Sequence, residues 1–485
     1  MLFSSTVFLF LFLPLTLAGY YLIPVTKFRN TFLLTASLLF YAWGEMAYVL
    51  VMAASIVLNY IFGWGMEHLR DKKPWSKCFF IAALAINLGL LVTYKYANFL
   101  VENFNIGLQV WGLDPIDLAP VHLPLGISFF TFKAVTYVVD VYRRKVPFQK
   151  NPQQLALYIS LFPYQVAGPI VRYQKLNRQL DDRSCSWADF SQGAERFIIG
   201  LGKKMILADS FGKQVDLIFS LPANQLPADT AWLGIVLYTL QLYFDFSGYS
   251  DMAIGLGKMF GFSFPENFNY PYVAASIREF WRRWHMTLSE WFREYLYIPL
   301  GGNRTSRPRV YFNLLLVFFL CGLWHGASWN FIIWGLFHGT FLILERLGLE
   351  SLLAKLFRPL RHLYALLVIM SGWIFFRSET LIQALDYFRA LLGFPGPEAV
   401  RNPAAGYLNV ELIVLLVVGV AASTPFWTWK GFPAANRSGH RPLKNSALYE
   451  WGSGLLYPAF LGVILLACAM LLANKSYSPF IYFRF

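Results

Sequence analysis

The stretch VYFNLLLVFFLCGLWHGASWNFIIWGLFHGTFLIL, residues 310–344, contains no Asp, Glu, Lys or Arg. As one helix it would extend about 52 Å, whereas the hydrocarbon core of a bilayer is about 30 Å thick. Two complete crossings would need about 40 residues, more than the stretch has. The sequence therefore predicts a helix break at Gly326-Ala327-Ser328, between two arms of about fifteen residues that are each too short to span a membrane comfortably.

His325 immediately precedes this predicted break. An imidazole in so apolar a segment costs free energy unless it is used, because lipid offers a polar side chain no hydrogen-bonding partner. We therefore expect His325 to be a functional residue at bilayer depth. Trp324 and Asn330, on either side of the break, are candidate substrate contacts, whereas His338 is interpreted as structural.

The composition is that of a membrane protein. Of the 485 residues, 57% are hydrophobic and only 14% are charged, and the mean hydropathy is +0.46. No soluble core needs this much apolar material, so we expect a polytopic, all-α membrane bundle. The apolar runs predict a single domain over residues 1–485, with about eleven crossings plus re-entrant and amphipathic helices. Residues 1–23 are interpreted as a retained transmembrane helix.

The net charge of +14 is explained by the loops. Basic loops near residues 27–29, 70–77, 143–145, 355–361 and 430–444 fall on one side, and the 101–120 loop has acidic residues but no Lys or Arg. Because cytoplasmic loops are enriched in Lys and Arg, this pattern predicts that both termini are periplasmic. Nucleic-acid binding is a poor explanation, since there is no separate basic domain.

Three further interruptions, at residues 124–126, 167–169 and 246–250, suggest an internal cavity, because irregular backbone is tolerated there only against protein or water. Asp251 is interpreted as the cap of a helix that begins near Met252. Asp245 precedes the last interruption and is a candidate for orienting a histidine or a substrate group.

Residues 276–298 predict one amphipathic helix, with Ser276 and Glu279 as a capping box. His285 lies on its apolar face, where it is either packed among tryptophans or part of a site. Three arginines on this helix could bind the phosphates of a charged carrier or could simply anchor the topology, namely Arg282, Arg283 and Arg293.

A neutral imidazole can accept a proton from a hydroxyl, and apolar burial keeps it unprotonated. No hydrolase, zinc-protease or NTPase motif is present, and four scattered cysteines predict neither a metal site nor a disulfide framework. A buried base, a groove and nearby arginines suit transfer of an acyl group from a charged carrier to a hydroxyl on the other side.

Several motifs resemble one family. They are K-Y-A-N-F (95–99), Y-F-D-F-S-G-Y-S-D-M-A-I-G-L-G (243–257), E-F-W-R-R-W-H-M-T-L-S (279–289), L-W-H-G (323–326) and W-N-F-I-I-W-G (329–335). These look like the membrane-bound O-acyltransferases, in particular the membrane component of bacterial alginate O-acetylation. The resemblance covers residues 1–347, and residues 348–485 are less distinctive.

This resemblance implies a funnel-shaped bundle in the bacterial inner membrane, with His325 as general base. His285 would position the donor thioester or stabilise developing charge. The donor would be cytoplasmic acetyl-CoA, with no bound cofactor, and periplasmic acetyltransferase partners would complete O-acetylation of an alginate-like or cellulose-like polysaccharide. The alternatives are D-alanyl transfer to teichoic acid and a non-enzymatic export scaffold.

Overall fold

The computed structural model describes residues 1–222, 225–394, 403–425 and 447–474, with side chains described from residue 456 in the last segment. Every regular element in these residues is a helix, which confirms the all-α class. The predicted count of eleven crossings is not confirmed, and residues 1–23 provide only the shorter apolar helix Phe8–Leu22. Six helices are long and apolar enough to cross a membrane, namely Val49–His68, Lys73–Val110, Arg307–His325, Trp329–Leu353, Arg358–Arg377 and Leu456–Ala473.

The helices follow one another with short connections. The first group is η1 (Phe8–Phe12), α1 (Leu13–Leu22), α2 (Thr26–Glu45), α3 (Val49–His68), α4 (Lys73–Leu91), η2 (Val92–Tyr96), α5 (Ala97–Val110), α6 (Ile127–Tyr142), α7 (Pro152–Ser160), η3 (Phe162–Tyr164) and α8 (Tyr173–Asp181). The second is α9 (Trp187–Gly202), η4 (Lys203–Ala208), α10 (Asp209–Phe219), α11 (Ala228–Met259), η6 (Pro271–Val273), α12 (Ile277–Trp281), α13 (Met286–Phe292) and η7 (Arg293–Tyr297). The third is α14 (Arg307–His325), α15 (Trp329–Leu344), η8 (Glu345–Leu349), α16 (Glu350–Leu353), α17 (Arg358–Arg377), α18 (Leu381–Leu391), η9 (Ala404–Gly406), α19 (Val410–Ala422) and α21 (Ala447–Ala473).

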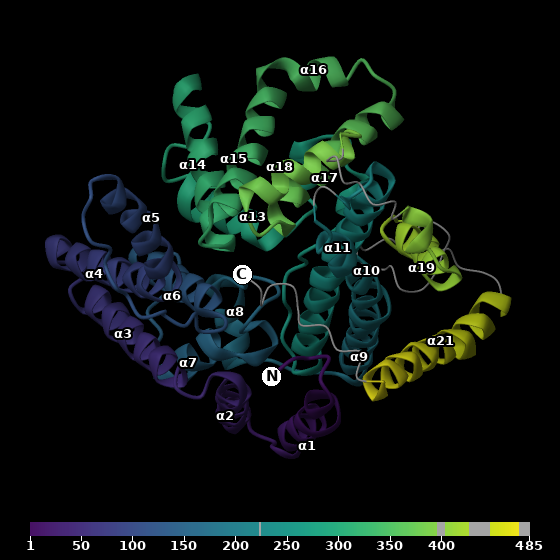
Figure 1. Cartoon of the computed structure of the whole chain (residues 1–485). Helices are drawn as coiled ribbons and strands as arrows, with labels where there is room; N and C mark the ends of the chain where they lie inside the picture. Colours follow the sequence, from purple (N-terminus) through teal and green to yellow (C-terminus); the bar gives the residue numbers. More distant parts are fainter. Residues whose placement is uncertain (223–224, 395–402, 426–446, 475–485) are drawn as a thin grey trace.

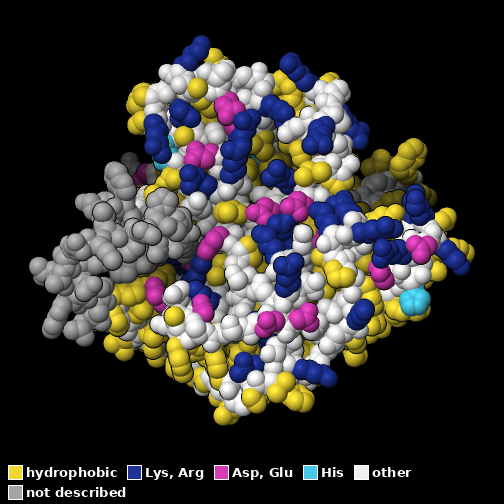
Figure 2. Space-filling view, turned by 180° about the vertical axis from the view of Figure 1, so that it is seen from behind, with side chains coloured by type: hydrophobic (Ala, Val, Ile, Leu, Met, Phe, Trp, Pro, Cys, Tyr) yellow, Lys and Arg dark blue, Asp and Glu magenta, His cyan; other side chains and the backbone are white. Residues whose placement is uncertain are grey.

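Figure 1 shows how these helices are arranged. The N-terminal helices α1–α4 lie along the lower and left margins, and α14–α17 form the upper part. Between them runs α11, which packs against α9, α10, α17 and α18. The opposite view in Figure 2 shows Lys and Arg gathered over the upper and middle parts, whereas the lower edge is largely hydrophobic.

The predicted break after His325 is confirmed. α14 ends at His325 and α15 begins at Trp329, so the two form a helical hairpin. Since α15 leads up to α16 at the top of Figure 1, the break lies toward the middle of the molecule. The predicted arm lengths are wrong: α14 has 19 residues and the second arm, Trp329–Leu353, has 25. Helical structure continues into the charged flanks, and both arms are therefore long enough to cross a membrane.

The predicted interruption at residues 246–250 is also wrong, because α11 continues without a break for 32 residues. Gly248 serves close packing instead: a Cβ there would lie 2.7 Å from the carbonyl oxygen of Gly200 on α9. Asp251 is not a helix cap but lies inside α11, where it pairs with Arg196 and Lys203 at 2.8 and 2.7 Å. The other two interruptions are present, at Gly126 (φ +74°) and Gly168 (φ +101°).

The predicted helix over residues 276–298 is divided. α12 ends at Trp281, and α13 begins after His285, whose φ of +41° is left-handed. The preceding segment competes for the backbone here, since the main-chain nitrogen of Met286 donates to the carbonyl oxygen of Asn267 at 2.9 Å. Ser276 does cap α12 by accepting from the nitrogen of Glu279, but the Glu279 carboxylate binds the nitrogen of Ala275, so the capping box is only half formed.

Candidate active site

The two predicted histidines meet on either side of one indole ring. The Trp324 ring lies 6.0 Å from the His285 ring and 4.9 Å from the His325 ring, measured between centroids. His325 comes from the last residue of α14 and His285 from the turn between α12 and α13, more than thirty residues earlier. Both side chains are buried, at 5% and 0% exposure. The fold thus brings together the two residues that the sequence placed in separate motifs.

Hydrogen bonding fixes the orientation of His285. Its Nδ1 lies 3.0 Å from Asn267 Oδ1, which also accepts from the hydroxyl of Thr287 at 2.8 Å and from the Thr287 main-chain nitrogen. Because that backbone N–H can only donate, the Asn267 atom must be the oxygen, and His285 Nδ1 must carry the proton. Burial lowers the pKa of His285 far below its ordinary value, so the ring is neutral.

It follows that His285 Nε2 carries a lone pair. This atom is buried and has no hydrogen-bonding partner among the described residues. Trp324 Nε1, a donor, is likewise buried and unpartnered in the part of the chain that the structure describes. The site therefore presents one unused acceptor and one unused donor, which is what a bound polar substrate group requires.

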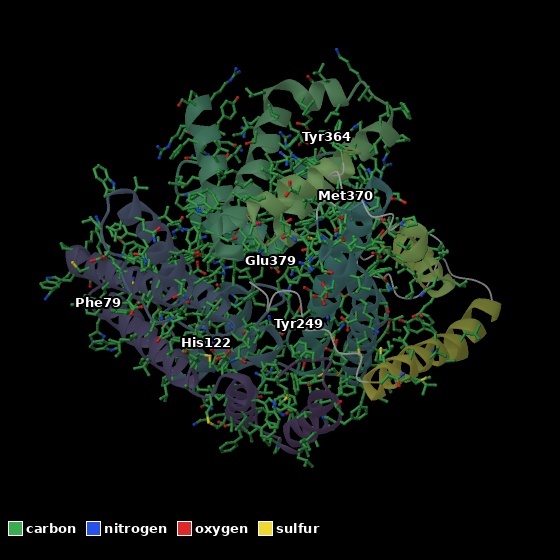
Figure 3. The ribbon with its side chains drawn as sticks, viewed as in Figure 1. Phe79, His122, Tyr249, Tyr364, Met370 and Glu379 are labelled. Atoms are coloured by element: carbon green, nitrogen blue, oxygen red, sulfur yellow. The ribbon has the colours of Figure 1, made fainter. Side chains whose placement is uncertain are left out.

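His325 lies in an aromatic pocket, with ring centroids of Trp334 at 4.9 Å and Phe376 at 5.2 Å. Figure 3 shows why α17 reaches this region: Tyr364 and Met370 lie on its upper part, and Glu379, just beyond its end, lies near the middle of the molecule. Asn330 connects the two elements, since its Nδ2 donates to the carbonyl oxygen of Ser378 at 2.6 Å. Asn330 thus holds the start of α15 against the end of α17.

A cavity of about 300 Å³ adjoins the histidines, between the α12–η7 segment and α14. Its wall includes Leu288, one turn after His285, and Cys321, one turn before His325, so it reaches to within about one helical turn of both. Arg282 and Arg293 line it without an ion pair in the described residues. Arg278 and Arg346 line it too, but Arg278 pairs with Glu350 and Arg346 donates to Asn303.

The remaining candidates lie elsewhere. Arg283 does not line the cavity; it pairs with Glu279 at 2.9 Å and donates to the carbonyl oxygen of Asn269. Asp245 is buried in α11, where it forms an ion pair of 2.7 Å with Lys204. His338 is fully buried among aromatic rings, such as Trp281 at 5.2 Å.

Sequence reasoning missed Asn267 and Lys95. Asn267 lies in an irregular segment with no periodicity, and nothing in its local sequence indicates a contact with a histidine 18 residues later. Lys95 belongs to the K-Y-A-N-F motif, which contributed to the family resemblance but suggested no role. Its Nζ donates to the carbonyl oxygens of Trp324 and His325, at 2.5 and 3.2 Å.

Comparison with known proteins agrees with this geometry. The model of the membrane-bound O-acyltransferase family matches residues 118–378, which include both histidines and the cavity. The chain belongs to this family. It is 40% identical over its whole length to the full-length probable alginate O-acetylase AlgI of Azotobacter vinelandii. It is 36% identical to the peptidoglycan O-acetyltransferase of Helicobacter pylori, over 84% of this chain and 83% of that protein.

A more distant relative is the teichoic acid D-alanyltransferase of Bacillus subtilis, 32% identical over 45% of this chain and 58% of that protein. Membership of the family makes this membrane-bound O-acyltransferase a multi-pass membrane enzyme, as predicted. The non-enzymatic export scaffold is therefore excluded.

Proposed function

We propose that this acyltransferase moves an acetyl group from a cytoplasmic thioester, acetyl-CoA, to O-acetylate a polysaccharide outside the bacterial inner membrane. The observation that carries the proposal is the convergence of His285 and His325 on Trp324, beside a cavity with two unpaired arginines. Relatives named for alginate and peptidoglycan O-acetylation support an acetyl group and a sugar hydroxyl as donor and acceptor.

His325 acts in this proposal as the general base on the accepting hydroxyl. The sequence left two roles for His285, and its hydrogen bonding favours one of them. In the tautomer set by Asn267, Nε2 accepts but cannot donate, so it can position an N–H or O–H of a bound substrate but cannot stabilise an oxyanion. Trp324 Nε1–H is the better candidate for donating to the developing charge on the thioester carbonyl oxygen.

The donor enters through the cavity, with its phosphates at Arg282 and Arg293. Arg143, in a basic loop that the sequence assigns to the cytoplasm, donates to the carbonyl oxygen of Glu294, the residue after Arg293. The cavity rim and this loop therefore lie on the same face, which supports a cytoplasmic opening. Because both histidine rings are buried, the aromatic wall must rearrange to admit the thioester.

The acceptor side involves periplasmic acetyltransferase partners, which complete transfer to an alginate-like or cellulose-like polymer. Both termini are proposed to be periplasmic, although residues 475–485 lie outside the described part of the chain. D-alanyl transfer is the second candidate function, favoured only by the similarity to the teichoic acid enzyme over less than half of this chain. It requires an aminoacyl carrier protein as donor, so purified enzyme would not accept the acyl group of acetyl-CoA.

Replacement of His325 tests the proposal in cells. His325→Gln should abolish polysaccharide O-acetylation while the protein reaches normal levels in the membrane. His338→Gln is the matched control, because it changes a buried histidine on the neighbouring helix that does not contact Trp324's other partner, His285; it should retain acetylation. Normal acetylation by His325→Gln would refute the base role, and transfer of D-alanine but not acetyl would favour the second candidate.

A further inference from the structure

Four residues on one side of the η2–α5 segment take no part in the chemistry proposed above. They are Lys95, Tyr96, Phe99 and Asn103, and Lys95, Phe99 and Asn103 are spaced four residues apart. On a helix, this spacing places side chains on one face. In the structure, that face contacts both sides of the break at residues 326–328.

The first contact is with the end of α14. The last four carbonyl groups of a helix lack partners within the helix. Here the oxygen of Leu323 accepts from the Tyr96 hydroxyl at 2.8 Å, and those of Trp324 and His325 accept from Lys95 Nζ. An ammonium group at a helix C-terminus also interacts favourably with the helix dipole. Lys95 and Tyr96 thus satisfy the carbonyls of the turn that carries His325.

The second contact is with the start of α15. Trp329 is the first residue of that helix, and its Nε1 donates to Asn103 Oδ1 at 2.8 Å. The Phe99 ring lies 5.9 Å from the Trp329 ring. Because the break itself has only three residues, holding both neighbouring turns leaves it little freedom to bend.

We propose that Lys95, Tyr96, Phe99 and Asn103 form a bracket that fixes the direction of the His325 ring, with Lys95 as a positioning residue for acyl transfer. The inference rests on the proposed role of His325. His325 ends its helix, and the carbonyl that Lys95 binds at 3.2 Å is the histidine's own. Without that contact the last turn can rotate, and a displacement of about 1 Å at a reacting group costs about 10²-fold in rate.

Lys95→Met tests the bracket, because it keeps the length of the side chain and removes the ammonium. With purified enzyme and labelled acetyl-CoA, kcat should fall about 10²-fold with the donor KM unchanged, since the cavity arginines are untouched. Lys95→Arg, which keeps a cation and its donors, should restore most of the rate. Thr93→Val, an exposed change in the same π-helical turn, is the control and should behave as the unchanged enzyme.

A second measurement does not depend on activity. Amide hydrogen exchange over residues 322–328 should become faster in Lys95→Met and remain unchanged in Thr93→Val. Unchanged exchange, or an equal kcat for the two variants, would overturn the bracket. A loss of kcat that Lys95→Arg does not rescue would also overturn it. Failure of the base role would show instead as activity in His325→Gln, measured in the same assay.

Discussion

Replacing Asn267 with leucine should disable His285 while leaving the donor cavity intact. The Asn267 side chain makes three hydrogen bonds of 2.8 to 3.0 Å, to His285 Nδ1, Thr287 Oγ1 and Ser250 Oγ. Leucine has a similar size but offers none of them. The bond to His285 is the one that assigns its tautomer, so its loss allows the proton to move to Nε2 and removes the acceptor from the site.

The expected magnitude follows from that single bond. A net contribution of about 0.5–1.5 kcal/mol corresponds to a change of about 2- to 13-fold in the tautomer ratio. The freed ring can also turn, and misplacement of a positioning group can cost up to about 10²-fold. We therefore expect kcat for acetyl transfer to fall by about 10- to 100-fold, with a smaller change in the KM for acetyl-CoA.

Ser250→Ala is the matched control. It also removes a buried hydrogen bond of Asn267, the one donated by Nδ2 at 3.0 Å, but leaves the bond between Oδ1 and His285. Both variants should lose stability, because each leaves a buried polar group without its partner, at about 1–3 kcal/mol for each such group. Only Asn267→Leu should lose turnover. Equal turnover of the two variants at matched amounts of folded protein would refute the tautomer argument.

Three further outcomes are expected. Asp251→Asn should lower the free energy of unfolding by about 3–5 kcal/mol, because it breaks the buried pairing with Arg196 and Lys203; an unchanged melting temperature in detergent would contradict this. Arg282→Ala combined with Arg293→Ala should raise the KM for acetyl-CoA at least tenfold and remove its salt dependence, whereas Arg283→Ala should leave that KM unchanged, because Arg283 is engaged by Glu279. Although partial burial opposes the effect, its hydrogen bond and ion pair with Arg172 hold the pKa of Glu294 below its usual value. Glu294 therefore stabilises the fold above its unfolded pKa of about 4.3, and this contribution is lost as the pH falls through the lowered value; Glu294→Gln should flatten the melting temperature measured over that acidic range.

The sequence predicts the parts of this molecule that depend on local pattern. An uncharged stretch too long for one crossing and too short for two predicted the break after His325, and the turn residues at 124–126 and 167–169 predicted real interruptions. Glycine at 248 misled the same reasoning, because a glycine that lets two helices approach looks, in sequence, like a glycine that ends one. Only the position of Gly200 on α9 distinguishes the two.

Contacts between distant segments could not be predicted. The division of the 276–298 helix results from Asn267, which supplies a backbone acceptor and a side-chain acceptor from outside that helix. Periodicity placed Arg282, Arg283 and Arg293 on one charged helix, but the turn at His285 separates Arg283 from the two arginines that line the cavity. Lys95 was visible only as part of a motif, because its partners are main-chain atoms more than two hundred residues away.

Transfer across a sealed membrane tests the central claim most directly. Proteoliposomes would contain acetyl-CoA labelled in its acetyl group, with a hydroxyl-bearing oligosaccharide and co-purified periplasmic partners outside. The unchanged enzyme should label the external oligosaccharide, and His325→Gln, reconstituted at the same level, should give only background. Equal labelling by His325→Gln would contradict the proposal that this buried histidine carries out the transfer.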